Sequence, residues 1–330
     1  MTNENDIPLF ARANINLASA KLRARAVTTS DDFFAPMGRM LLDAEPVFIP
    51  GKFDENGKWM DGWESRRRRD DGHDWVIVAL AARGVIHGVD IDTRFFTGNY
   101  PPFASIEGCD DVEGPSPNTK WREMVPRMAL KGDSHHFVEI EPGDPVTHLR
   151  LNIFPDGGVA RLRAYGRAVP VRVDGELDLA SALNGARCIE WNDSHFGDPQ
   201  CLLYPGRGED MGDGWETRRR RESGNDWMIV ALGMIGEIDR VLVDTAHFKG
   251  NFPDRCSLEA VLMDDGNAGP GDFENAAWSP VLDQMKLQMD HVHEYSGDLI
   301  HRAGKVSHVR FNIYPDGGVS RLRVIGQAAG

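Results

Sequence analysis

The sequence has few cysteines, a deficit of positive charge and no long apolar run. Its four cysteines show no C-x-x-C spacing, so they indicate neither a disulfide framework nor a zinc knuckle. Lys and Arg number 37 against 51 Asp and Glu, and the net charge of −14 disfavours binding to nucleic acid or to an anionic membrane. No apolar segment is long enough to span a bilayer, and the N-terminal residues lack the pattern of a secretory leader. We therefore expect a cytoplasmic protein with no nucleic-acid or membrane partner.

The composition is that of an ordinary folded protein. Hydrophobic residues form 41% of the chain and charged residues 27%. Because one domain takes roughly 150 residues, a length of 330 residues predicts about two domains.

The chain contains one unit twice. The block DGWESRRRR at 61 to 69 returns as DGWETRRRR at 213 to 221, and HLRLNIFPDGGVARLR at 148 to 163 returns as HVRFNIYPDGGVSRLR at 308 to 323. Shorter matched pairs fill the intervals in the same order. A repeat of this length predicts two domains of one fold, which we place at 1–170 and 171–330.

The spacing between matched blocks differs in two places. The first copy has ten more residues ahead of its DGWE block, whereas the second has eight more in the DDGNAGPGDFENAAW region. Length changes concentrate in surface loops, which often carry function. We therefore expect the two copies to have diverged in role there.

Short β-branched runs between Gly and Pro dominate both copies and predict strands rather than helices. The runs are DWVIVALA (74 to 81), VIHGVDID (85 to 92), DWMIVALG (226 to 233) and RVLVDTAHF (240 to 248). A further strand follows each PDGG sequence, which we expect to close a hairpin. The predicted fold is all-β, with two tandem jelly-roll β-sandwich repeats and a boundary near 166 to 176.

Taken together, the ordered blocks resemble the allantoicase family over nearly the whole chain, from about Leu17 to Arg323. The resemblance implies jelly rolls similar to galactose-binding or discoidin-like domains. It also implies a homo-oligomer that hydrolyses allantoate to ureidoglycolate and urea, as part of purine degradation through allantoin. Two alternatives stay open: a non-catalytic discoidin-like protein that binds ligands, and a hydrolase for another ureide such as ureidoglycolate.

An anionic ureide needs cationic, planar partners, and arginine supplies them. The candidate substrate-binding residues are Arg67, Arg69, Arg94, Asn99, Arg219 and Arg221. If the arginine blocks are strands, alternate arginines face opposite sides, so one pair in each copy faces a pocket. The alternative is that these arginines pair with Asp61, Glu64, Asp213 and Glu216 to hold the sandwich together.

Cleavage of the C–N bond to the leaving urea needs a proton donor and a base for the attacking water. The candidate catalytic residues are His73, Glu64, Asp92 and His148. Glu107, Glu259, Asp244 and His308 are further candidates, although residues repeated in both copies can also be structural. Asp156 and Asp316 belong to PDGG turns and are expected to form those turns.

Differences between the copies favour the first one as the catalytic copy. His73 is matched by Asn225, and Arg94 by Ala246, so the first copy has an additional imidazole and guanidinium. We therefore expect Arg67 and Arg69 to matter more than Arg219 and Arg221. A pocket composed from both copies is the alternative.

The histidines give only a weak indication of a metal. His135-x-Phe137 is aligned with His293-x-Tyr295, and His291 and His293 would share one face of a strand. Because two partly exposed histidines are the simpler interpretation, no residue is assigned as a metal ligand. No cofactor is predicted with certainty, although a divalent metal remains an option.

Overall fold

The protein divides into two compact units, Met1–Val169 and Pro170–Gly330. The computed structural model describes residues 7–170, 175–263 and 268–329. The division lies inside the expected boundary region, of which residues 171–174 are outside the described residues.

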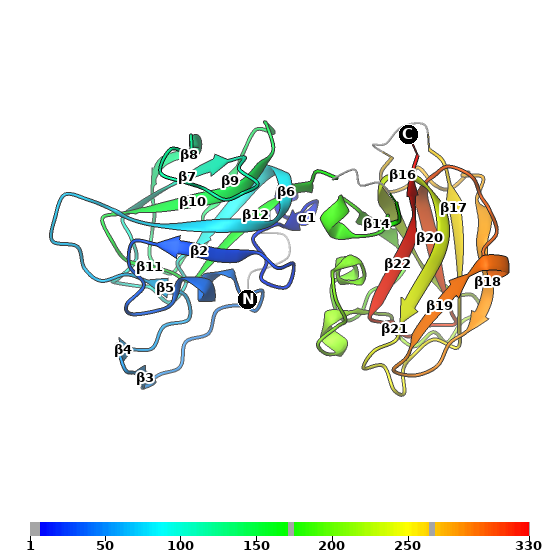
Figure 1. Cartoon of the computed structure of the whole chain (residues 1–330). Helices are drawn as coiled ribbons and strands as arrows, with labels where there is room; N and C mark the ends of the chain where they lie inside the picture. Colours follow the sequence, from blue (N-terminus) through cyan, green and yellow to red (C-terminus); the bar gives the residue numbers. More distant parts are fainter. Residues whose placement is uncertain (1–6, 171–174, 264–267, 330) are drawn as a thin grey trace. The chain divides into compact units, whose positions relative to one another are not determined.

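The first unit is an antiparallel sandwich centred on one long strand, β6 (Figure 1). The first half of β6 pairs with β2 and β10, and its second half pairs with β9 and β12. The strand order is β1-β12-β6-β10-β7-β8. Its strands are β1 (Ile15–Asn16), β2 (Arg25–Thr29), β6 (Asp74–Asp92), β7 (Phe103–Cys109), β8 (Arg122–Ala129), β9 (Phe137–Glu139), β10 (Val146–Phe154) and β12 (Arg161–Ala168).

The second unit repeats this order as β13-β22-β16-β20-β17-β18. The predicted fold class is therefore confirmed: the chain is all-β and folds as two tandem sandwich repeats. Its strands are β13 (Leu177–Asp178), β14 (Arg187–Trp191), β16 (Asp226–Asp244), β17 (Arg255–Val261), β18 (Ser279–Lys286), β19 (Val292–Ser296), β20 (Val306–Tyr314) and β22 (Arg321–Ala328).

The prediction of two separate strands at 74 to 81 and 85 to 92 is wrong. Both runs belong to β6, because the residues between them continue the extended backbone. Between the two runs, the hydrogen-bonded partner of β6 changes from β10 to β12. The same holds for β16, which ends at Asp244, so residues 245–248 follow the strand.

Short elements complete the described structure. The two-residue strands are β3 (Phe53–Asp54), β4 (Gly57–Lys58), β5 (Trp63–Glu64), β11 (Gly158–Val159), β15 (Trp215–Glu216) and β21 (Gly318–Val319). The helices are α1 (Leu9–Arg12), η2 (Met37–Leu41), η3 (Ala182–Asn184), η4 (Pro199–Leu203), η5 (Met211–Asp213) and η6 (Gly297–Leu299). Within the described ranges, every helix is too short or too polar to cross a membrane.

Alternation along the strands builds the core of the first unit. Leu149, Leu151 and Ile153 of β10 are fully buried, together with Val76 and Val78 of β6. Because successive side chains point to opposite faces of a sheet, the residues between them lie on the outer face. This alternation places the polar residues of β10 outside the core.

The PDGG turns do not close hairpins, contrary to the prediction. After the turn, β11 pairs with β5, while β12 pairs with β6 rather than with β10. Gly157 has a φ of +141°, and a Cβ there would lie 2.6 Å from the backbone nitrogen of Pro101. The turn therefore crosses between layers against the 99–101 backbone, and only glycine fits this close approach.

We predict that Gly157→Ala destabilises the protein by more than ~1 kcal/mol, because alanine adds both a positive-φ penalty and a backbone clash. Thermal unfolding followed by circular dichroism measures this effect. Gly98→Ala is the matched control, since a Cβ at Gly98 meets no atom within 4 Å. Equal melting temperatures for the two variants would show that the close approach at Gly157 is not a constraint.

Candidate active site

The four-arginine segments are not strands, so the predicted alternation of their side chains is wrong. Residues 65–69 follow β5 as irregular chain. Arg66 pairs with Asp31 at 2.6 Å, and Arg68 pairs with Asp74 at 2.7 Å. The predicted binding residues Arg67 and Arg69 are exposed, with 73% of the Arg67 side chain accessible.

The second copy arranges its segment in the same way. Arg218 pairs with Asp193 and Arg220 with Asp226, both at 2.7 Å, whereas Arg219 and Arg221 are exposed. The suggested partners of the arginine blocks were therefore wrong: Asp61 and Asp213 instead bind Arg161 and Arg321, which begin the last strand of each unit.

Glu64 and Asn99 bind each other. The Asn99 amide donates to the Glu64 carboxylate at 2.7 Å, and Asn251 and Glu216 repeat this bond at 2.5 Å. Burial raises the pKa of Glu64, although the hydrogen bond from Asn99 acts in the opposite direction. Because both copies have this pair, it fits a structural link between the DGWE and TGN segments.

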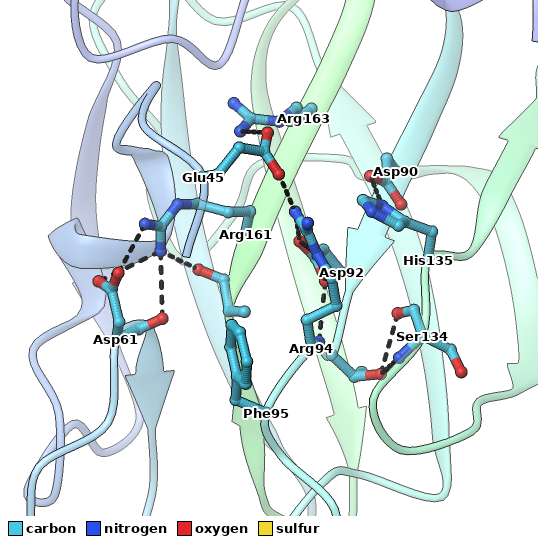
Figure 2. Close-up of polar contacts among 12 residues, drawn as sticks. Glu45, Asp61, Asp90, Asp92, Arg94, Phe95, Ser134, His135, Arg161 and Arg163 are labelled. Atoms are coloured by element: carbon cyan, nitrogen blue, oxygen red, sulfur yellow. Dashed lines mark hydrogen bonds and ion pairs between the residues drawn. The ribbon is translucent and has the colours of Figure 1, made fainter. Parts of the chain in front are cut away.

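Asp92 and Arg94 form an ion pair at the end of β6 (Figure 2). Arg94 Nη2 lies 2.7 Å from the buried Asp92 carboxylate and also contacts Glu45. In the second unit Arg207 binds Asp244 at 3.0 Å, so a guanidinium from another segment replaces the one that Ala246 lacks. The Arg94 difference therefore does not remove positive charge from this position.

The alignment of His135 with His293 made from the sequence is wrong, because the structural equivalent of His293 is His136. His136 and His293 share the same contacts, from Nδ1 to the carbonyl oxygens of Ile91 and Val243, so these two histidines are equivalent. His135 instead binds Asp90 at 2.7 Å, and this hydrogen bond raises the pKa of His135.

The His291 and His293 pair does not form a metal site. His293 uses Nδ1 on Val243 and accepts from the backbone N–H of Gln288 at Nε2, so neither nitrogen is available. Throughout the part of the chain that the structure describes, no three His, Cys, Asp or Glu side chains are grouped to share a metal ion.

His148 is buried on β10, where its Nδ1 shares a hydrogen bond with the Thr147 hydroxyl at 2.9 Å. Burial lowers its pKa, and lowers the pKa of the equivalent His308 to about 4. His148 lies four residues along β10 from Asn152 and does not join the other predicted catalytic residues.

Of the predicted residues, His73 lines a cleft. The cleft has a volume of about 370 Å³ on the outer face of β6, β10, β7 and β8. In the strand register, Asn152 of β10 lies opposite Trp75 of β6 and Ser105 of β7. Arg150, two residues earlier on β10, lies opposite Glu107 of β7. The lining residues are His73, Trp75, Ser105, Glu107, Glu123, Arg150, Asn152 and Phe154.

A chain of hydrogen bonds crosses this cleft. Arg150 binds the Glu107 carboxylate at 2.6 Å, and the Asn152 amide donates to the same carboxylate oxygen at 2.9 Å. The Asn152 carbonyl oxygen therefore faces His73 Nε2, at 3.3 Å, which makes Nε2 the donor. The His73 ring is packed against Phe154, and in the neutral state its Nδ1 can accept a proton.

Ser105, Glu107, Arg150 and Asn152 form the floor of this cleft. The second unit repeats this floor. Arg310 binds Glu259 at 2.6 Å, and the Asn312 amide donates to Glu259 at 3.1 Å and to Ser257 at 3.3 Å. The residues around the floor differ. The strand registers match Glu123 with Pro280 and Arg127 with Gln284, and the sequence matches His73 with Asn225.

Arg127 adds a second guanidinium next to the first cleft. It lies over the ring of Phe154 at 4.3 Å, and among the described residues it makes no ion pair. The first cleft therefore has one guanidinium, two carboxylates and an imidazole in its lining and a second guanidinium beside it, and these groups can hold a small anion and move protons.

Sequence analysis missed Arg127 and Glu123 and gave Arg150 no role. The repeated R-x-N pattern of HLRLN and HVRFN was a usable signal, because residues two apart share a face of a strand. Arg127 and Glu123 could not be compared with the second copy, because the eight-residue insertion hides the alignment of β8 with β18.

The fold and the cleft define a protein of two equivalent β-sandwiches, each with a polar cleft suited to a small, charged ligand. The family model "Allantoicase repeat" matches residues 15–169 and 177–329. A probable allantoicase of Burkholderia mallei is 52% identical over 98% of this chain and 97% of the relative. A probable allantoicase of Pseudomonas paraeruginosa is 51% identical over 96% of both chains.

A solved structure agrees with these relatives. The allantoicase of Saccharomyces cerevisiae has a TM-score of 0.80 and is 36% identical, over 96% of this chain and 95% of the yeast chain. The chain belongs to the allantoicase family.

We predict that His308 makes stability depend on pH. Its pKa falls from 6.5 to about 4 on folding, so below pH 6.5 the unfolded state takes up a proton that the folded state does not. The free energy of unfolding should therefore drop by ~3 kcal/mol between pH 6.5 and 4 through this group. Calorimetry of the wild type and His308→Gln at pH 7 and pH 4.5 measures it. A variant with an unchanged pH dependence would contradict the burial of a neutral imidazole.

Proposed function

We propose that the protein hydrolyses allantoate to ureidoglycolate and urea in the cleft of its first unit. It is thus an amidinohydrolase, a hydrolase acting on the C–N bonds of linear amidines. Membership of the allantoicase family supports the reaction. The observation that carries the location is that His73 and Glu123 line a cleft whose floor both units share, with Arg127 beside it over the ring of Phe154.

The cleft has partners for each part of this substrate. Arg150 and Arg127 supply guanidinium groups for the carboxylate, and Arg127 has no competing carboxylate among the described residues. Glu107 and Asn152 offer acceptors for the N–H groups of a ureido substituent. Trp75 provides a flat, partly exposed surface for a planar group.

The reaction breaks the bond between the central carbon and one ureido nitrogen. A water oxygen forms the new bond to that carbon, the electron pair of the C–N bond goes to nitrogen, and urea leaves. Protonated His73 is placed to donate from Nδ1 to the leaving nitrogen, because Nε2 is bound to Asn152. Glu123, exposed at the edge of the cleft, takes the proton of the attacking water.

The other predicted site residues receive different roles. Glu64 with Asn99 and Asp92 with Arg94 are held in ion pairs or hydrogen bonds that have counterparts in the second unit. These contacts suit structural links. Exposed Arg67 and Arg69 follow Glu64 along the chain, and their neighbour Arg68 binds the carbonyl oxygen of His73 at 3.1 Å. A role for Arg67 and Arg69 in attracting the anion remains a prediction.

A non-catalytic binding protein is not favoured. A site built for neutral sugars would present aromatic rings with few charges, whereas this cleft is lined by Glu107, Glu123 and Arg150. Activity on ureidoglycolate stays a prediction, which a second assay measures. Cytoplasmic location and a homo-oligomer are retained as predictions, and light scattering of the purified protein measures the oligomer.

We predict that the purified protein releases urea from allantoate and not from allantoin or arginine. The assay is repeated after dialysis against a chelator and after addition of a divalent metal, which measures whether a metal activates the reaction. Folded protein that releases no urea under any of these conditions would contradict the proposed reaction.

We predict that His73→Asn lowers kcat by about 10²- to 10⁴-fold and leaves KM within a few-fold, because it removes a proton carrier. Arg127→Gln should instead raise KM by about 10- to 100-fold through loss of a charge-assisted contact. Both variants introduce residues that the second unit already has.

Steady-state kinetics measures these effects, and His195→Asn on the surface is the matched control. Arg67→Ala and Arg69→Ala are measured in parallel. Losses larger for these two than for His73→Asn would move the site to the exposed arginine segment.

A further inference from the structure

The second unit has its own cleft, larger than the first and with the same floor. Its volume is about 500 Å³, and Trp227, Ser257, Glu259, Arg310 and Asn312 line it. These residues are the equivalents of Trp75, Ser105, Glu107, Arg150 and Asn152. Both the residues and the hydrogen bonds among them are repeated.

The floor offers what a ureido group needs. Arg310 presents N–H donors next to the Glu259 carboxylate, which is an acceptor. A ureido group is planar and has donors on its nitrogens and an acceptor on its carbonyl, so both kinds of partner can be satisfied at once. The Trp227 side chain lies beside this floor and can pack against a planar group.

The insertion of the second copy packs behind the arginine of this cleft, where Trp278 takes the place that Trp121 has beside Arg150. Trp278 lies under the Arg310 guanidinium at 5.1 Å, and Phe273 and Trp278 pack with Ile229 and Trp227 of β16. Residues 264–267 of the insertion are outside the described residues. The insertion thus supports the binding arginine instead of filling the cleft.

The residues proposed for proton transfer in the first cleft are replaced at the equivalent positions of the second. Asn225, Pro280 and Gln284 stand where the first cleft has His73, Glu123 and Arg127. Asn225 keeps the contact to the Asn312 carbonyl oxygen, at 3.4 Å, but an amide carries no titratable proton. Asp283 also lines this cleft, but it stands at the position of Pro126 and binds the His301 imidazole at 3.0 Å. The binding elements are therefore retained, whereas an amide replaces the imidazole that contacts the shared asparagine.

We propose that the cleft of the second unit is a separate site that binds a ureido compound without hydrolysing it. The inference rests on the proposed function, because the ligand class is taken from the floor that the two clefts share. The protein would then bind two ureides per chain and turn over one.

Isothermal titration calorimetry of the full chain with allantoate tests this. His73→Asn serves as the background because it slows turnover. We expect two molecules bound per chain in this background, and one after addition of either Arg150→Met or Arg310→Met. Gln284→Trp, at an exposed position on the edge of the second cleft, should also reduce two to one without touching the floor.

One molecule bound per chain, lost with Arg150→Met and unaffected by Arg310→Met and Gln284→Trp, would overturn the second site while leaving the proposed function intact. The proposed function fails separately, if the wild type releases no urea from allantoate. Loss of turnover with Arg310→Met but not with Arg150→Met would overturn both, because catalysis would then lie in the second unit.

Discussion

The site depends on one carboxylate that accepts two hydrogen bonds on an open sheet face. Glu107 accepts from Arg150 and from Asn152 at the same oxygen, and this fixes the orientation of the Asn152 amide and hence the donor nitrogen of His73. The arrangement follows from antiparallel register, which places Arg150 opposite Glu107 and Asn152 opposite Ser105. Leu149, Leu151 and Ile153 are fully buried on the other side of the same strand. The core therefore sets the positions of the polar side chains.

Duplication separates binding from chemistry. Both units keep the floor, so the carboxylate and guanidinium pair is common to them, while His73, Glu123 and Arg127 are replaced by uncharged residues at the same positions of the second unit. The replacement of Arg94 by Ala246 is weaker evidence for a catalytic first copy than it was in the sequence. Arg207 supplies a guanidinium to Asp244 from another segment of the second unit. A difference between copies is informative only where no neighbouring residue replaces the lost group.

Much of the fold could be predicted from sequence, since the repeat and the β-branched runs define two all-β units. The hairpin at PDGG was wrong because a turn sequence does not determine which strand comes next, and Gly157 crosses between layers. In the site, His73 was found through its difference from Asn225. Arg127 and Glu123 were not, because an insertion hid their counterparts. The arginine blocks drew attention through their charge, yet Arg66 and Arg68 are used in local ion pairs.

A crystal structure of His73→Asn with allantoate bound tests the central claim most directly. We expect density in the first cleft, with the substrate carboxylate within hydrogen-bond distance of Arg150 or Arg127 and a ureido nitrogen facing residue 73. Density at the Asp92 and Arg94 ion pair, or against Arg67 and Arg69, with the first cleft empty, would contradict it.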